Sequence, residues 1–299
     1  MPARLTAYVP DQAAVVRLLE DEAVYRIGRA SDCEIHVGHP SVSRFHAEIT
    51  GQDGLWRVHD TGSKNGLRVD GQLVRVAEFR DGTWFSIGDV HCAFERLDQA
   101  SAAAHREAGD DRRSRSHALS SQLRPDLGMS TLLPQTLDVV LQLSGLERGF
   151  VLFAGPGEAL RVRASRGLKN EEIAANHFAG SAAAIDRALE TGKSVVCTDT
   201  SDSPWLGTRP SVRLGGIRAL VCVPLSMAGG ATGVIYVDSR KPGPPVTELD
   251  LELVETIAGN ACTAIEVARV QERIDDVVRA LAREEAQAPL WQDLRRGAA

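Results

Sequence analysis

The sequence predicts a multidomain chain, with an N-terminal all-β sandwich followed by a C-terminal α+β domain that ends in a long helix. Over residues 1–97, short segments of alternating or β-branched residues are separated by turn signals such as GHPS, TGSKNG and RDG. From Met129 onward, apolar residues at helical spacing alternate with strong strand segments. The length of 299 residues is enough for two domains of ordinary size.

Many short strands without a convincing helix are typical of a β-sandwich. Within residues 1–97 the strands are expected at 4–9, 14–19, 24–28, 33–37, 46–50, 55–60, 66–70, 72–76, 83–88 and 91–97. Residues 98–128 are rich in Ala, Ser, Arg and Asp and contain almost no β-branched residues. We therefore expect a flexible linker there, in which some alanines form at most a transient helix.

The second domain is expected over residues 129–268, as an antiparallel sheet with flanking helices. Its strands are predicted at 149–155, 160–167, 194–200 and on both sides of the Gly-rich turn in 219–240. Helices are predicted over 129–146 and 180–192, the second ending at Gly192 as a C-cap. A long helix is predicted after Thr247, which resembles an N-cap.

The C-terminal extension, residues 269–299, continues this helix and carries an apolar seam. Its members alternate spacings of three and four, as in a heptad repeat: Val267, Val270, Ile274, Val277 and Leu281. A short coiled coil between two copies is the preferred interpretation, because the seam continues past the end of the domain. The alternative is a helix that lies on its own domain.

Composition excludes several classes of function. The formal charge of −6 argues against nucleic acid as the main partner. The five cysteines, at positions 33, 92, 197, 222 and 262, form neither a disulfide framework nor a zinc motif. No signal peptide or membrane-spanning run is visible, so we expect a cytoplasmic protein without a metal, a cofactor or a membrane contact.

Polar side chains gather at the ends of three predicted strands in the sandwich. Arg29 follows the first of these strands, Ser43 and Arg44 precede the second, and the sequence TGSKNG over 61–66 follows the third. Loops at one end of a sandwich present their side chains together. A guanidinium and hydroxyls suit phosphate oxygens, and no activated nucleophile is needed. The pattern predicts a site that binds phosphate without cleaving it.

Three motifs, RIGR at 26–29, SRFH at 43–46 and GSKNG at 62–66, resemble the forkhead-associated (FHA) domain, a β-sandwich that binds phosphothreonine peptides through its loops. The resemblance implies that Arg29 and Ser43 hold the phosphate and that Arg44 supports it. It also implies that Ser63 adds a hydroxyl.

The same resemblance implies that Asn65 hydrogen-bonds the ligand backbone, and it places Lys64 in the binding loop, where many members have Thr. It gives structural roles to Gly28, His46 and Gly66. A sandwich that binds partners without phosphate is the alternative.

The second half resembles a GAF domain, through GFVLFAG, RALETGKSVVCTD, GIRALVCVPL, TGVIYVDSR and the closing helix. This family binds small ligands or works as a dimeric sensor. The order of the two domains resembles the input half of bacterial enhancer-binding transcription activators.

The resemblances together imply a signalling adaptor, not an enzyme, in Ser/Thr-kinase-linked or transcriptional regulation. It would bind a phosphothreonine protein or a kinase through its first domain, and dimerise or sense a small molecule through its second. The alternative is a sensor of a cyclic nucleotide or another metabolite, in which the sandwich is a phosphate-independent scaffold.

Overall fold

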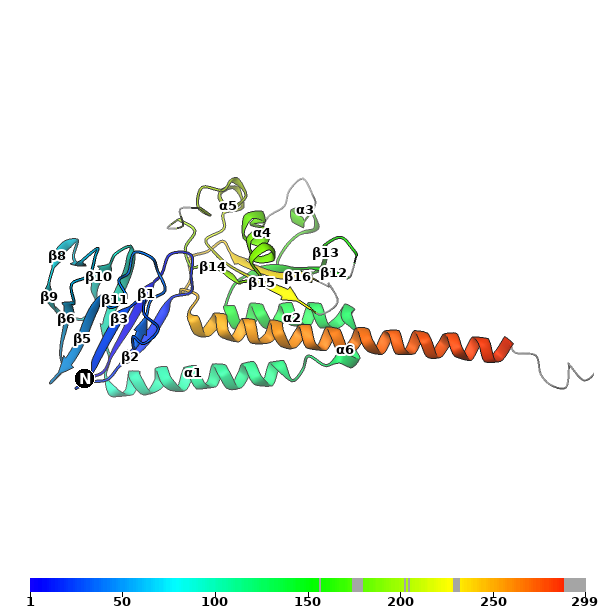
Figure 1. Cartoon of the computed structure of the whole chain (residues 1–299), viewed down its shortest axis with the longest axis horizontal. Helices are drawn as coiled ribbons and strands as arrows, with labels where there is room; N and C mark the ends of the chain where they lie inside the picture. The colour runs from blue at the N-terminus through cyan, green and yellow to red at the C-terminus, as the bar shows by residue number, and fades with distance from the viewer. Residues whose placement is uncertain (156, 174–179, 202, 204, 228–231, 288–299) are drawn as a thin grey trace, which may run out of the picture.

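The computed structural model describes residues 1–155, 157–173, 180–201, 203, 205–227 and 232–287. Figure 1 shows a β-sandwich joined by a long helix to an α+β domain, from which the last helix projects. The predicted fold class is confirmed for both domains.

The sandwich consists of two sheets. The strand order is β2-β1-β11-β10-β7-β8 in one and β4-β3-β5-β6-β9 in the other. Every pairing is antiparallel except that of β3 with β4. The strands are β1 (Ala3–Tyr8), β2 (Val15–Leu19), β3 (Val24–Gly28), β4 (Ile35–His36), β5 (Ala47–Gln52), β6 (Leu55–Asp60), β7 (Leu67–Val69), β8 (Gln72–Val74), β9 (Val76–Phe79), β10 (Thr83–Ile87) and β11 (Val90–Arg96).

Alternating residues of both sheets fill the space between them. Three aromatic rings form the centre of this core: Phe94 lies 4.6 Å from Phe79 and 5.7 Å from Trp56, measured between ring centroids. All three side chains are almost completely buried. Burial of such large apolar surfaces stabilises the sandwich and holds its end loops on a rigid base.

The second domain is built on one antiparallel sheet of order β13-β12-β16-β15-β14. Helices α2 and α6 lie along one face of this sheet, and α4 and α5 lie on the other side (Figure 1). The elements are α2 (Met129–Ser144), β12 (Arg148–Ala154), β13 (Arg161–Arg166), α3 (Asn170–Ile173), α4 (Ala182–Thr191), β14 (Val195–Cys197), α5 (Pro210–Gly215), β15 (Ala219–Ser226), β16 (Thr232–Ser239) and α6 (Glu248–Gln287).

Capping residues mark the helix ends, as the sequence predicts. Gly192 closes α4 with φ of 63°, a left-handed conformation that glycine adopts readily. At the start of α6, Asp250 accepts a hydrogen bond from the Thr247 amide, and the Thr247 hydroxyl accepts one from the Asp250 amide. Helix α6 continues to Gln287, so the predicted extension is helical that far, and 288–299 lie outside the described residues.

The predicted flexible linker at 98–128 is instead largely helical. Helix α1 (Gln99–Ser120) is capped by Asp98, whose side chain accepts a hydrogen bond from the Ser101 amide, and a 3-10 turn, η1 (Pro125–Leu127), follows. The prediction is wrong because a shortage of β-branched residues does not exclude a helix. Alanine and arginine are strong helix formers, and Arg112 ties α1 to α6 through an ion pair with Asp250.

Direct contacts join the two domains. The turn between β1 and β2 reaches the start of α6, where the Ala14 amide donates to the Val246 carbonyl at 2.8 Å and the Glu248 amide donates to the Ala14 carbonyl at 3.0 Å. Arg17 also forms an ion pair with Glu248, at 2.8 Å. Among the described helices, none is both long and apolar enough to cross a membrane.

Candidate functional site

The predicted phosphate-binding residues lie in three loops at one end of the sandwich. Arg29 directly follows β3, Ser43 and Arg44 lie between β4 and β5, and residues 63–65 lie between β6 and β7. Because β5 pairs with both β3 and β6, these loops emerge beside one another. We refer to Arg29, Ser43, Arg44, Ser63, Lys64 and Asn65 as the loop site.

Hydrogen bonds tie the first loop to the second. The Arg29 amide donates to the Ser43 carbonyl at 2.9 Å, and the Arg29 side-chain Nε donates to the Val42 carbonyl at 3.3 Å. The guanidinium therefore lies over the loop that carries Ser43, and its remaining N–H groups are available to a ligand.

The third loop is attached to the second in the same way. The Lys64 amide donates to the Ser43 hydroxyl oxygen at 3.0 Å, and the Asn65 side-chain Nδ2 donates to the Ser41 carbonyl at 2.7 Å. Because the Ser43 oxygen accepts in this bond, its own hydrogen is free to donate to an anion. The structure thus brings residues 29, 43, 64 and 65 together.

Ser63 has a bracing role in this arrangement. Its hydroxyl oxygen accepts a hydrogen bond from the Gly66 amide at 2.9 Å, and its own amide donates to an Asp60 carboxylate oxygen at 3.3 Å. These bonds close the turn that presents Lys64 and Asn65.

Two glycines allow the loops to approach so closely. A Cβ atom on Gly28 would lie 2.1 Å from the Arg44 carbonyl oxygen, a distance that no side chain can occupy. Gly66 has φ of +76°, and a Cβ there would lie 2.3 Å from Leu73. The close approach accounts for glycine at position 28, and the left-handed φ accounts for glycine at position 66.

His46 is completely buried beneath the site and fixes two of the loops. The Ser43 amide donates to its Nδ1 at 3.1 Å, so Nδ1 carries no proton and Nε2 donates to the Gly66 carbonyl at 3.1 Å. Burial lowers the pKa of His46 below the ordinary value of 6.5, because a charged imidazolium loses its hydration there.

Because His46 is neutral in the folded protein, we expect the protein to lose stability in mild acid. The unfolded chain takes up a proton at His46 near pH 6.5, whereas the folded chain does so only at a lower pH. The contribution of the neutral His46 to the free energy of unfolding is therefore fully present above pH 6.5. It is lost as the pH falls toward the folded pKa, with a limiting slope of about 1.4 kcal/mol per pH unit for one proton. His46→Gln should reduce this slope in urea unfolding series. Equal slopes in the wild type and His46→Gln would contradict this assignment.

The loop site carries exposed positive charge. Arg29, Arg44 and Lys64 are all exposed, and none of them forms an ion pair with a carboxylate in the described part of the chain. By contrast, nearby Arg26 is held by Glu34, with Nη2 to Oε1 at 2.9 Å. Three cations without a carboxylate partner, in loops that meet at Ser43, can bind an oxyanion.

Ser41 and Gly88 support the loop site, although no motif in the sequence marks them as site residues. Ser41 accepts the Asn65 hydrogen bond through its carbonyl, and its hydroxyl oxygen accepts one from the Asp89 amide at 2.9 Å. Gly88 has φ of +61°, and a Cβ on it would lie 2.6 Å from the Ser41 carbonyl oxygen. Turn signals in the sequence mark both positions, but only the fold places them together.

Two family models match the chain. The family model of the FHA domain matches residues 25–88, and that of a GAF domain matches residues 126–266. The glycogen accumulation regulator GarA of Mycobacterium tuberculosis is 35% identical over 78 residues, which are 26% of this chain and 48% of GarA.

The ABC transporter ATP-binding/permease protein Rv1747 of the same organism is 33% identical over 93 residues, or 31% of this chain and 10% of that protein. The chain thus spans less than half the length of these two curated relatives. Among solved structures, Mycobacterium tuberculosis EmbR in complex with a low-affinity phosphopeptide is 28% identical, covers 30% of this chain and 24% of its own, and has a TM-score of 0.26.

Proposed function

Because the chain carries an FHA domain followed by a GAF domain, we propose that it is a non-catalytic signalling adaptor that binds phosphothreonine proteins through the loop site. The partner is a Ser/Thr kinase or a substrate of one. Since kinases make phosphothreonine where ATP is available, we assign this adaptor to the cytoplasm.

One observation carries the proposal: Arg29, Arg44 and Lys64 remain unpaired within the described residues, in a chain with a net charge of −6. Elsewhere in this sandwich, arginines such as Arg26 and Arg57 are held by carboxylates. Charge-assisted hydrogen bonds contribute roughly 1.5–3 kcal/mol each. Two or three of them support micromolar affinity, which corresponds to about −8 kcal/mol.

A phosphothreonine peptide array, probed with the full chain beside the unphosphorylated twin of each peptide, tests this proposal. We expect binding to a subset of the phosphorylated peptides and to none of the twins. Equal binding to both members of each pair would favour the rival function, in which the sandwich is a phosphate-independent scaffold for a small-molecule sensor. A metabolite that raises the melting temperature while Arg29→Ala leaves partner binding intact would support that rival.

The second part of the proposal is a homodimer formed through α6. Beyond the second domain this helix projects alone (Figure 1), and its seam residues Val267, Val270, Ile274, Val277 and Leu281 are each 50–59% exposed. A heptad seam of this kind buries its apolar side chains against a second copy. In such a dimer, once one site has bound a partner with two phosphosites, the second site binds intramolecularly at a raised effective concentration.

Substitution of the central seam residue tests the dimer. Ile274→Lys places a charge in the seam, and we expect it to convert the dimer to a monomer in sedimentation at tens of micromolar protein. Glu272→Lys introduces the same residue on the opposite helix face, and it should leave the dimer intact. A monomeric wild-type protein at the same concentration would refute this part of the proposal.

A further inference from the structure

A cleft of about 710 Å³ lies between the two domains, on a side of the sandwich next to the loop site. The sandwich contributes residues from the β1–β2 turn, the β4–β5 loop, β10 and β11, and the second domain contributes residues at the end of β14, after it, and before α6. The domains are held in place here, because the Ser203 hydroxyl donates to an Asp11 carboxylate oxygen at 2.5 Å. We refer to this space as the interdomain cleft.

Ser41 connects the interdomain cleft to the loop site. Its carbonyl accepts from Asn65 of the loop site, whereas its hydroxyl contacts two residues that line the cleft. The Asp89 amide donates to that hydroxyl oxygen at 2.9 Å, and the His39 Nδ1 lies 2.7 Å from it. A peptide held at the loop site therefore has the cleft as a neighbouring surface.

An aromatic pair forms one wall of the cleft. The rings of Tyr8 and Trp84 are stacked, with centroids 5.5 Å apart and an interplanar angle of 20°. Trp84 is 53% exposed, although its indole is one of the largest apolar groups in the sandwich. An exposed tryptophan face attracts the cationic end of an arginine or lysine side chain.

The charges that line the cleft favour a cation. Asp11, Asp89 and Asp199 line it, and among the described residues no lysine or arginine does. Asp199 is neutralised by Arg218 at 2.9 Å, whereas Asp89 forms no ion pair with any other residue that the structure describes. Two carboxylates in the same cleft as a stacked indole thus complement one guanidinium or ammonium group.

We propose that the interdomain cleft binds an arginine or lysine side chain that flanks the phosphothreonine of the partner. Both domains then select the partner: the loop site holds the phosphate, and the cleft holds the basic residue. This inference rests on the proposed function, because the loop site must first hold the phosphopeptide.

The test is a titration of the full-length protein with labelled phosphothreonine peptides in an alanine background. One arginine is moved through the positions on both sides of the phosphothreonine, and the all-alanine phosphopeptide is the reference. At one or more positions we expect the arginine to tighten binding about five- to tenfold, as a cation–π contact at a partly desolvated site does.

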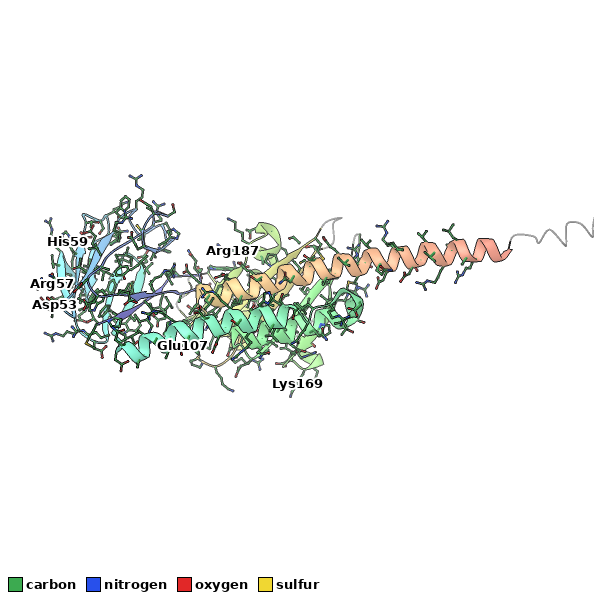
Figure 2. The ribbon with its side chains drawn as sticks, turned by 90° about the horizontal axis from the view of Figure 1, so that it is seen from below. Asp53, Arg57, His59, Glu107, Lys169 and Arg187 are labelled. Carbon is green, nitrogen blue, oxygen red and sulfur yellow. The ribbon has the colours of Figure 1, made fainter. Side chains whose placement is uncertain are left out.

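Variants of the cleft residues test whether the gain in peptide affinity from the arginine arises in the cleft. Trp84→Ala and Asp89→Asn should each remove most of it and leave the affinity for the all-alanine phosphopeptide unchanged, whereas Trp84→Phe retains an aromatic face and should keep part of it. Asp53→Asn is the matched control for charge, because Asp53 lies in the turn between β5 and β6, at the opposite end of these strands from the loop site and away from the second domain (Figure 2).

A failure of the cleft proposal can be distinguished from a failure of the proposed function. An arginine that gives no gain at any position, or a gain that persists in both Trp84→Ala and Asp89→Asn, would overturn the cleft proposal while phosphopeptide binding stands. A wild-type protein that binds none of the phosphopeptides would overturn the proposed function, and the cleft proposal with it.

Discussion

Arg29→Ala is expected to weaken the binding of a phosphothreonine peptide by roughly a hundredfold. The forked guanidinium of Arg29 can donate two charge-assisted hydrogen bonds to phosphate oxygens, and the variant loses both. The folded protein should be almost unaffected, because the Arg29 side chain is exposed and gives up one 3.3 Å bond, to the Val42 carbonyl, among the interactions of the described residues. Fluorescence anisotropy of a labelled peptide measures the affinity, and a thermal melt checks the fold.

Arg57→Ala is the matched control for this measurement. Arg57, labelled in Figure 2, is also an exposed arginine of the sandwich. It lies on β6 and is paired with Glu78 at 2.8 Å. Its loss should change peptide affinity by less than about twofold, because it is not part of the loop site. If Arg29→Ala and Arg57→Ala bind the phosphopeptide equally well, Arg29 does not hold the phosphate.

Asp238→Ala is expected to destabilise the GAF domain by about 3–5 kcal/mol. The Arg148 Nε donates to an Asp238 carboxylate oxygen at 2.5 Å, and these side chains are only 5% and 2% exposed. Removal of the carboxylate leaves the buried guanidinium without its nearest counter-charge, at a depth where water cannot replace it. In calorimetry of the full chain, the melting transition of this domain should fall by about 10 °C or more.

A surface ion pair of the same domain provides the comparison. Arg166 donates to Asp138 at 2.6 Å, but these side chains are 43% and 51% exposed. Water and salt screen such a pair, so Asp138→Ala should cost about 0–1 kcal/mol. Similar losses of stability in Asp138→Ala and Asp238→Ala would show that burial does not decide the strength of these ion pairs.

Much of the fold could be predicted because local patterns agree with the tertiary structure. The alternation in residues 47–52 places Ala47 and Ile49 in the core, and the same period holds along β6 and β11. Gly192 and Thr247 end and begin helices through backbone chemistry that is local to each residue. The FHA motifs mark the strand ends that the pairing of β3, β5 and β6 brings together.

The remaining features depend on contacts between segments that are distant in sequence. Helix α1 was missed because its stability comes partly from Arg112, which contacts Asp250 far along the chain. The role of Ser41 depends on its hydrogen bonds with Asn65 and Asp89. Both residues lie far from Ser41 in the sequence, so no local pattern predicts these bonds. The interdomain cleft requires the docking of the β1–β2 turn against α6, which periodicity alone does not specify.

The most direct test of the loop site is an NMR titration of the full chain with a phosphothreonine peptide and its unphosphorylated twin. We expect the phosphopeptide to shift the backbone amides of Ser43 and Lys64, the Nε resonance of Arg29 and the side-chain amide of Asn65, while Asp53 stays unchanged. The twin should shift none of these signals. Equal shifts with both peptides, or shifts confined to other parts of the molecule, would contradict the claim that these three loops form the phosphate-binding site.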